Sequence, residues 1–485
     1  MATFDEALPK GVAAGGRATA SRTRSGARGA GPAAVAEGVE RAWPRTTRIL
    51  PWLLAAFLVM LWLVPFDSIT APFSVGVDSK LDRVVLVLIV GIWVVLAAAG
   101  GRHGPRFRRS PLNLAILALV VIAMASIATQ LGILTNLGAL KLSIKQLALL
   151  LSYFTFFFFV VTVARPQEVR NLLRLMLALA CLTALGTIYE YRFHTNLFFS
   201  LSASVFKGFT IAPPAAAMPF ARPPIVGPTQ APLADATILA IALSFALVFL
   251  FHAKRRRDQL LWYIACALLL AGALATGRKS SVLIPVAALI ALLLHAPRRA
   301  VRFLPALLLL VALVRVIAPH AISSLLYQFE TVSTSTSTAH RTEAYPAITP
   351  LILSHPFLGI GYGSYDPHKY WILDNQYLDW LVQTGFLGLA AFILLLVTGA
   401  AVAYRAARSK DPTREVLGLA LVGAIAGFAV ACATFDVFAF PQAPYLLMFV
   451  LALAVVAAAE RERTITPAVG EGGDMPLLCA ERSEP

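Results

Sequence analysis

The residues of this chain that could do chemistry stand between long apolar runs. Arg278 and Lys279 form a basic pair in a four-residue turn between two apolar segments. Arg341 follows a run of alternating Ser and Thr, and Asp374 precedes another apolar segment. A guanidinium is a planar donor that binds phosphate oxygens in pairs, and a carboxylate can take a proton from a hydroxyl. Phosphate binding and general base catalysis are therefore the chemistry that these residue types offer.

Three further polar side chains lie near Asp374 in the sequence. His355 is a second candidate for the base, or a turn residue bonded to the backbone. Asn375 and Tyr377 suit a sugar, through hydrogen bonds and ring stacking. Asn375 could equally hydrogen-bond the loop, and Tyr377 could belong to an interfacial aromatic belt. Asp374 itself has an alternative role as the N-cap of the helix that follows.

The basic residues have alternatives of their own. Arg278 could extend along a helix end to the lipid headgroups, Lys279 could do the same, and Arg341 could belong to a solvated charged patch. The acidic residue Asp366 and the neighbouring His368 could be combined with Asp374 as metal ligands, but their spacing defines no metal site. We expect no metal and no other cofactor.

The composition excludes an ordinary soluble enzyme. Of 485 residues, 58% are hydrophobic and only 14% are charged, whereas soluble domains have about 45–50% apolar and 25% charged residues. The formal net charge is +16, but the basic residues lie mostly between apolar runs and indicate membrane topology, not a nucleic-acid partner. The sequence predicts an all-α membrane protein.

Apolar runs long enough to cross a bilayer core of roughly 30 Å are the main organising feature. We expect about twelve transmembrane helices, approximately at 49–66, 84–101, 114–134, 147–164, 172–190, 233–252, 260–277, 282–296, 303–319, 379–404, 416–434 and 445–459.

Basic residues orient these spans within the 49–459 transmembrane domain. The tail 1–48, every second connection and the tail 460–485, together with their immediate helix ends, hold 29 of the 41 Lys and Arg residues, so both tails are expected in the cytoplasm. The first tail, rich in Ala, Gly, Arg, Ser and Pro, is predicted to be disordered. We therefore expect a multi-pass protein of the cytoplasmic membrane, with membrane lipid as a partner.

Two long segments, 191–232 and 320–378, fall on the exterior side, and the second is expected to carry the site between helices 9 and 10. Pro346 and Pro350 should limit any helix there to short pieces. The glycines of the following GIGYG run predict a tight turn.

Four sequence elements in this region resemble the O-antigen ligase and O-antigen polymerase superfamily. They are ATGRKSS at 275–281, Arg341, SHPFLGIGYGSY at 354–365 and DNQYLDWLVQTGFLGL at 374–389. They are similar to the family's "TGSR(S/T)" element, Arg, "HPxxGxGxG" turn and "HNxxLxxLxxxGxxG" helix start, in the same order. The chain departs from the ligase pattern at Asp374, where the family has His.

The resemblance implies an inverting, metal-independent glycosyltransferase with the architecture of the polytopic C-type enzymes. Such an enzyme moves a saccharide from a polyprenyl-diphosphate carrier to a hydroxyl of a glycan, glycolipid or protein acceptor, on the outer face of the cytoplasmic membrane. Arg278 and Arg341 are then expected to hold the diphosphate and Asp374 to be the base. Lys279, Asn375, His355 and Tyr377 are expected to bind substrate.

Two other functions fit the topology. Twelve spans suit a transporter or flippase of a lipid-linked saccharide, and an exterior Asp is also the catalytic group of the peptidoglycan glycan-chain polymerases of the elongation class. Ion-coupled carriers usually place ionisable residues in mid-membrane, whereas the polar groups of this chain gather in exterior segments. The sequence therefore favours the transferase.

Overall fold

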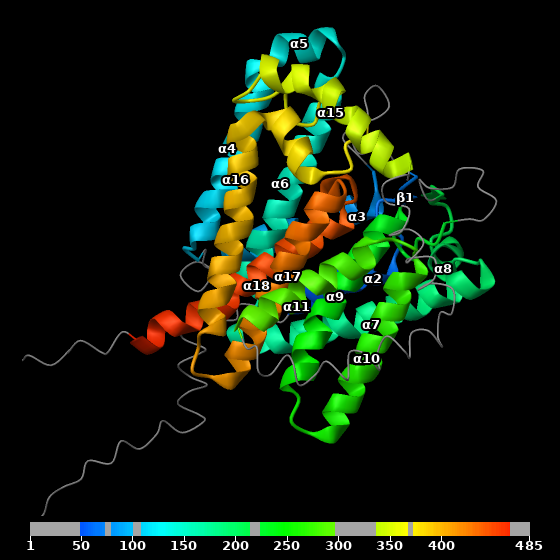
Figure 1. Cartoon of the computed structure of the whole chain (residues 1–485), viewed down its shortest axis with the longest axis vertical. Coiled ribbons are helices and arrows are strands. Elements are labelled where there is room, and N and C mark those ends of the chain that lie inside the picture. The colour runs from blue at the N-terminus through cyan, green and yellow to red at the C-terminus, as the bar shows by residue number, and fades with distance from the viewer. Residues whose placement is uncertain are drawn as a thin grey trace, which may run out of the picture. The chain divides into compact units, whose positions relative to one another are not determined.

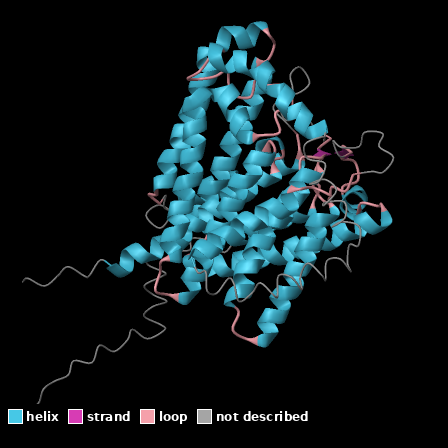
Figure 2. Ribbon diagram, viewed as in Figure 1, coloured by secondary structure: helices cyan, strands magenta, loops and turns pink. Residues whose placement is uncertain are grey.

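The computed structural model describes residues 49–72, 79–99, 108–213, 224–295, 336–366 and 372–465. All of them belong to one compact unit, Thr46–Pro485. Within these residues the protein is a helical membrane protein with one very small sheet (Figures 1 and 2).

Nine described helices are long and apolar enough to cross a membrane. They are α3 (Leu81–Ala99), α4 (Pro111–Thr129), α6 (Leu140–Val163), α7 (Val169–Phe193, preceded by the 3-10 turn η2, Pro166–Glu168), α9 (Pro232–His252), α10 (Arg256–Ala275), α16 (Gln376–Ala407), α17 (Pro412–Thr434) and α18 (Gln442–Ile465).

The remaining elements are shorter or lie in connections. They are α2 (Ile49–Leu63), α5 (Leu131–Asn136), α8 (Leu197–Val205), α11 (Ser280–His295), α15 (Thr336–Ser354), η3 (Val437–Ala439) and the strands β1 (Ile69–Thr70) and β2 (Thr210–Ile211). The strands pair antiparallel, with Ile69 opposite Ile211 and Thr70 opposite Thr210. This sheet joins two connections that are far apart in the sequence.

The core is built around α9 and α18, which are buried on nearly all sides. The helix α9 contacts α7, α10, α11, α17 and α18, and a helix that is apolar all round is expected to lie in such an interior. By contrast, α3 leaves large apolar side chains such as Val87, Leu88 and Val95 exposed. This exposure suits contact with lipid, because lipid tails are as apolar as the side chains.

Eleven of the twelve predicted spans coincide with helices, and the predicted span 303–319 lies outside the described residues. Two predictions about local structure were wrong. The third predicted span is broken at Gln130, where α4 ends and α5 begins. The helix α15 is also continuous through Pro346 and Pro350. Both prolines are exposed and one turn apart, so their rings lie on the same side of the helix, away from the buried Ile348.

Candidate active site

The start of α16 organises the site, and its N-cap is Asn375. The Asn375 side-chain oxygen accepts hydrogen bonds from the amides of Tyr377 (3.0 Å) and Leu378 (3.3 Å). The Asn375 amide donates to Asp436 Oδ1 at 2.8 Å, in the connection between α17 and α18. The alternative prediction that Asp374 caps this helix was therefore wrong by one residue. The Asn375 side chain thus caps α16, and its main-chain amide bonds the connection between α17 and α18.

Asp374 lies immediately before the cap in a strained backbone conformation. Its φ is 46°, in the left-handed region that Asp and Asn tolerate better than most residues. The side chain is half-buried. Because the capping hydrogen bonds belong to Asn375, helix capping does not account for a carboxylate at position 374.

Arg278 comes from a different part of the chain and lies within electrostatic reach of Asp374. Its side chain is accessible, yet enough protein surrounds the guanidinium that desolvation lowers the pKa of Arg278, while the Asp374 carboxylate acts to raise it. An opposite charge nearby favours the charged form. The structure thus brings together the two predicted residues with complementary charge.

The turn that carries Arg278 is held by local hydrogen bonds. Ser281 Oγ donates to the Ala273 carbonyl at 2.7 Å, and Thr276 Oγ1 donates to the same carbonyl at 2.7 Å. Gly277 has a φ of +67°, which lets the chain reverse between α10 and α11. Lys279 lies in the same turn and is half-buried.

The GIGYG run is the tight turn that the sequence predicts, and it docks on α16. Gly359, Gly361 and Gly363 all have positive φ. The amides of Ile360 and Gly361 donate to the carbonyls of Val382 and Gln383 at 3.1 Å each. These carbonyls are free because α16 is interrupted at Gly385, whose φ is 67° and ψ −168°. A Cβ at Gly385 would overlap the Phe357 backbone.

A polar stripe on α16 completes this junction, and sequence reasoning missed it. Gln376, Asp379 and Gln383 recur at helical spacing. Asp379 accepts hydrogen bonds from the side-chain amides of both glutamines. The carbonyl of Gln383 also accepts from Ser126 Oγ of α4 at 2.7 Å. Polar residues in a membrane span are costly unless they are paired with one another. The three- and four-residue spacing of these polar residues was therefore a sequence signal that could have predicted the network.

Arg341 belongs to α15, and its side chain lies outside the described part of the structure. A hydrophobic cluster holds the C-terminal half of that helix beside α16. Ile348 of α15, Tyr365 and Leu373 are buried together with Val382 of α16. The helix of Arg341 is thereby fixed to Leu373, the residue next to Asp374.

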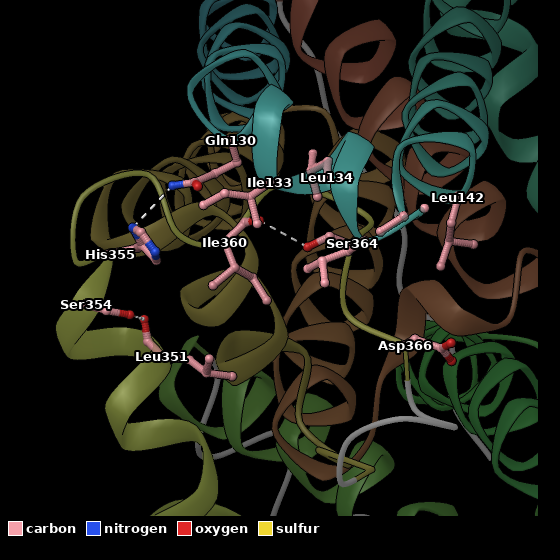
Figure 3. Close-up of a pocket in the computed structure, with 13 residues that line it drawn as sticks. Gln130, Ile133, Leu134, Leu142, Leu351, Ser354, His355, Ile360, Ser364 and Asp366 are labelled. Atoms are coloured by element: carbon pink, nitrogen blue, oxygen red, sulfur yellow. Dashed lines mark hydrogen bonds between the residues drawn. The ribbon is translucent and has the colours of Figure 1, made fainter.

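His355 lines a cavity of about 360 Å³ formed by α5, α15 and the GIGYG turn. Figure 3 shows its ring facing Gln130, and Gln130 Nε2 lies 3.2 Å from His355 Nδ1. The same amide nitrogen donates to the Gly359 carbonyl at 3.3 Å. If the amide donates to Nδ1, the neutral imidazole carries its proton on Nε2. Ser354, Ser364 and Asp366 supply further polar groups to the cavity.

Tyr377 contributes mainly to packing. Its hydroxyl donates to the Ala429 carbonyl of α17 at 2.9 Å, and its ring lies 5.8 Å from that of Phe392. A second aromatic group beside it includes Tyr362 stacked on Trp380, with centroids 5.2 Å apart. These contacts hold the GIGYG turn, α16 and α17 together.

The fold and these contacts define a polytopic helical membrane protein whose polar residues converge on one end of α16. Residues 264–393 match the family model described as O-antigen ligase. This segment, about a quarter of the chain, contains all seven predicted site residues and the Gly385 break. No curated protein matches the chain.

The family match confirms the resemblance that the four sequence elements indicate. Residues 264–393 carry an O-antigen ligase domain, embedded in a multi-pass membrane protein. The domain marks the protein as a glycosyltransferase-like enzyme of polysaccharide biosynthesis.

Proposed function

We propose that the protein transfers a glycan from a polyprenyl-diphosphate carrier to a hydroxyl of a glycan, glycolipid or protein acceptor, on the outer face of the cytoplasmic membrane. The observation that carries this proposal is that Arg278, from the turn between α10 and α11, lies within electrostatic reach of Asp374, which immediately precedes the N-cap of α16. A leaving diphosphate needs a fixed cation, and an attacking hydroxyl needs a base close to it. The O-antigen ligase domain supports this class of transfer.

The reaction is a single displacement with inversion at the anomeric carbon. The acceptor oxygen forms a bond to that carbon as the bond between carbon and diphosphate oxygen breaks. The hydroxyl proton passes to the Asp374 carboxylate, and the diphosphate leaves with the bonding electron pair. Arg278 stabilises the negative charge that develops on the diphosphate, with Arg341 and Lys279 as further cationic donors.

Glycan recognition is assigned to the cavity beside the GIGYG turn. His355, Ser354, Ser364 and Asp366 line it together with apolar side chains, and such a mixture of a few polar groups with apolar walls is typical of a ligand site. Gln130 Nε2 contacts Nδ1 of the His355 ring, so the other ring nitrogen, Nε2, remains available for a sugar hydroxyl. His355 then binds substrate and is not the base.

The proposed chemistry uses protein cations in place of a metal. Arg278 is protonated at any physiological pH, since even a lowered pKa of an Arg starts from a value far above neutrality. We therefore expect transfer to continue in the presence of a chelator.

The proposal is tested with the full-length protein in nanodiscs, supplied with a polyprenyl-diphosphate oligosaccharide and candidate acceptors. The measurement is the release of polyprenyl diphosphate, followed with and without a chelator. Acceptor-dependent release in chelator is the expected result. Movement of the intact donor between leaflets, with no release for any acceptor, would overturn the proposal in favour of the flippase.

A further inference from the structure

A second cavity, of about 990 Å³, lies at the opposite end of α10 from Arg278. Its walls come from α7, from the turn between α9 and α10, and from the first turns of α17. The α10 residue of the cavity lining nearest to Arg278 is Ala265, and the ten residues from there to the end of α10 at Ala275 span roughly 15 Å, at 1.5 Å per residue. The cavity is therefore distinct from the candidate active site.

Two arginines on one side of α7 give the cavity a cationic mouth. Arg170 and Arg174 are one helical turn apart, both are exposed and both line the cavity. Neither has a hydrogen-bond or ion-pair partner among the described residues. Lys254, from the turn between α9 and α10, adds a third cation. This arrangement is complementary to a phosphate group.

Beyond the arginines the same side of α7 is apolar. Ala178 and Cys181 continue the lining by one and two turns, and Leu261 and Trp262 of α10 face the cavity from the other wall. The Trp262 ring is supported by Phe249, with centroids 5.1 Å apart. A cavity with a charged mouth and an apolar wall between membrane helices fits an amphiphile, and basic pockets of this kind bind lipid headgroups.

The cavity also offers groups that suit an ammonium. Asp258 and Glu415 are the acidic residues among those that line it. His252 Nδ1 lies 2.9 Å from the Val248 carbonyl, so Nδ1 carries the proton, and its buried Nε2 has no partner in the described structure. In a neutral imidazole that nitrogen is an acceptor. A headgroup bearing both signs of charge would match the arginines on one side and Asp258 and His252 on the other.

We propose that this cavity binds a phospholipid whose headgroup carries a phosphate and a primary ammonium. The phosphate lies against Arg170 and Arg174, the ammonium faces Asp258 and His252 Nε2, and the acyl chains cover the apolar wall. Bound there, the lipid fills the space between α7 and α17. The inference does not depend on the proposed transfer reaction.

The test is native mass spectrometry of the full-length protein in detergent, titrated with phosphatidylethanolamine, phosphatidylglycerol and phosphatidylcholine. We expect phosphatidylethanolamine to bind most tightly. The Arg170→Gln and Arg174→Gln double variant should bind it roughly tenfold more weakly, because charged hydrogen bonds are lost. The matched control is the double variant Arg256→Gln with Arg257→Gln. These two exposed arginines lie at the start of α10 but do not line the cavity, so the control should bind phosphatidylethanolamine as the wild type does.

Two further variants locate the lipid. Asp258→Asn should remove the preference for phosphatidylethanolamine over phosphatidylglycerol. Ala178→Trp should block the apolar wall, whereas Leu182→Trp, an exposed change outside the cavity on the same helix, should not. Equal binding of the three lipids by the wild type, or undiminished binding by both the double arginine variant and Ala178→Trp, would overturn the proposal. Displacement of the lipid by polyprenyl phosphate would also overturn it, because the cavity would then belong to the donor.

Discussion

At the scale of single residues, neighbouring side chains at the start of α16 have different tasks. Asn375 forms the capping hydrogen bonds, whereas Asp374 takes the strained left-handed position and lies within electrostatic reach of Arg278. Stability and chemistry are therefore separable at adjacent positions. Substitutions at each can test which task it performs.

Arg278→Ala should slow glycan transfer by roughly 10²–10³-fold, about 3–4 kcal/mol, because one preorganised charge-stabilising donor is lost. The measurement is the rate of polyprenyl diphosphate release at saturating acceptor. Arg257→Ala, at the other exposed end of α10, is the control and should leave the rate unchanged. Wild-type turnover by well-folded Arg278→Ala would remove this residue from the mechanism.

Asp374→Asn should lower transfer by about 10²–10⁴-fold, the usual contribution of a general base, without lowering the thermal unfolding temperature. The reason is that Asn also tolerates the left-handed backbone. Asp374→His is expected to recover part of the activity, since a His stands at this position in the pattern that the chain resembles. Full activity of Asp374→Asn would contradict the proposed base.

Asn375→Ala should instead destabilise the protein, by about 1 kcal/mol, because α16 loses its side-chain cap. Asn375→Asp, which can form the same capping bonds, is the matched control and should keep the wild-type unfolding temperature. The comparison is made by thermal unfolding in detergent. Equal unfolding temperatures for the Ala and Asp variants would show that the cap is not needed.

At the scale of elements, the break in α16 is what allows the GIGYG turn to bind. A continuous helix would use the carbonyls of Val382 and Gln383 for its own hydrogen bonds, whereas the break at Gly385 leaves them to Ile360 and Gly361. The amide of Phe386 then donates to the Pro356 carbonyl at 2.8 Å. Backbone hydrogen bonds thus join two sequence motifs on both sides of the break.

Gly385→Ala should destabilise this junction by more than about 1–2 kcal/mol. A non-glycine residue in a left-handed conformation costs about that much by itself. The added Cβ would in addition overlap the Phe357 backbone. The measurements are the unfolding temperature and transfer activity, and both should fall. Gly91→Ala in α3 is the control, because no atom lies within 4 Å of the added Cβ. A Gly385→Ala protein as stable as the control would show that the break is not required.

At the scale of the whole chain, segments that are predicted to share a side of the membrane do come together. Residues from 165–171, 253–259 and 405–415, all expected in the cytoplasm, line or adjoin the cavity of the lipid site. Arg278 and Asp374, both expected on the exterior, lie near each other. The spacing of charges therefore agrees with the packing of the helices.

Single cysteines at Arg257 and Lys207, introduced after the four native cysteines are replaced, should be accessible from opposite sides of the membrane. Both positions are exposed, so reaction depends on the side and not on burial. An impermeant maleimide applied to intact cells should label Lys207→Cys only, and permeabilisation should allow labelling of Arg257→Cys. Labelling of both in intact cells would contradict the proposed topology.

The sequence by itself predicted the helical membrane architecture, because the length and apolarity of each span must match the bilayer whatever its neighbours are. It also predicted the family, since the four sequence elements keep their order and spacing. The small sheet, the break at Gln130 and the continuity of α15 through two prolines were not predicted. Each of these features depends on a local contact or on local exposure, and the periodic pattern of apolar residues in the sequence contains no information about either.

The tertiary structure decided which candidate residues act together. It placed Arg278 within electrostatic reach of Asp374, assigned the cap to Asn375 and engaged the Tyr377 hydroxyl with the Ala429 carbonyl. It also revealed the Asp379 and Gln383 network. These outcomes depend on which helix ends meet, and that is fixed by the packing of side chains across helices rather than by the sequence around any one of them.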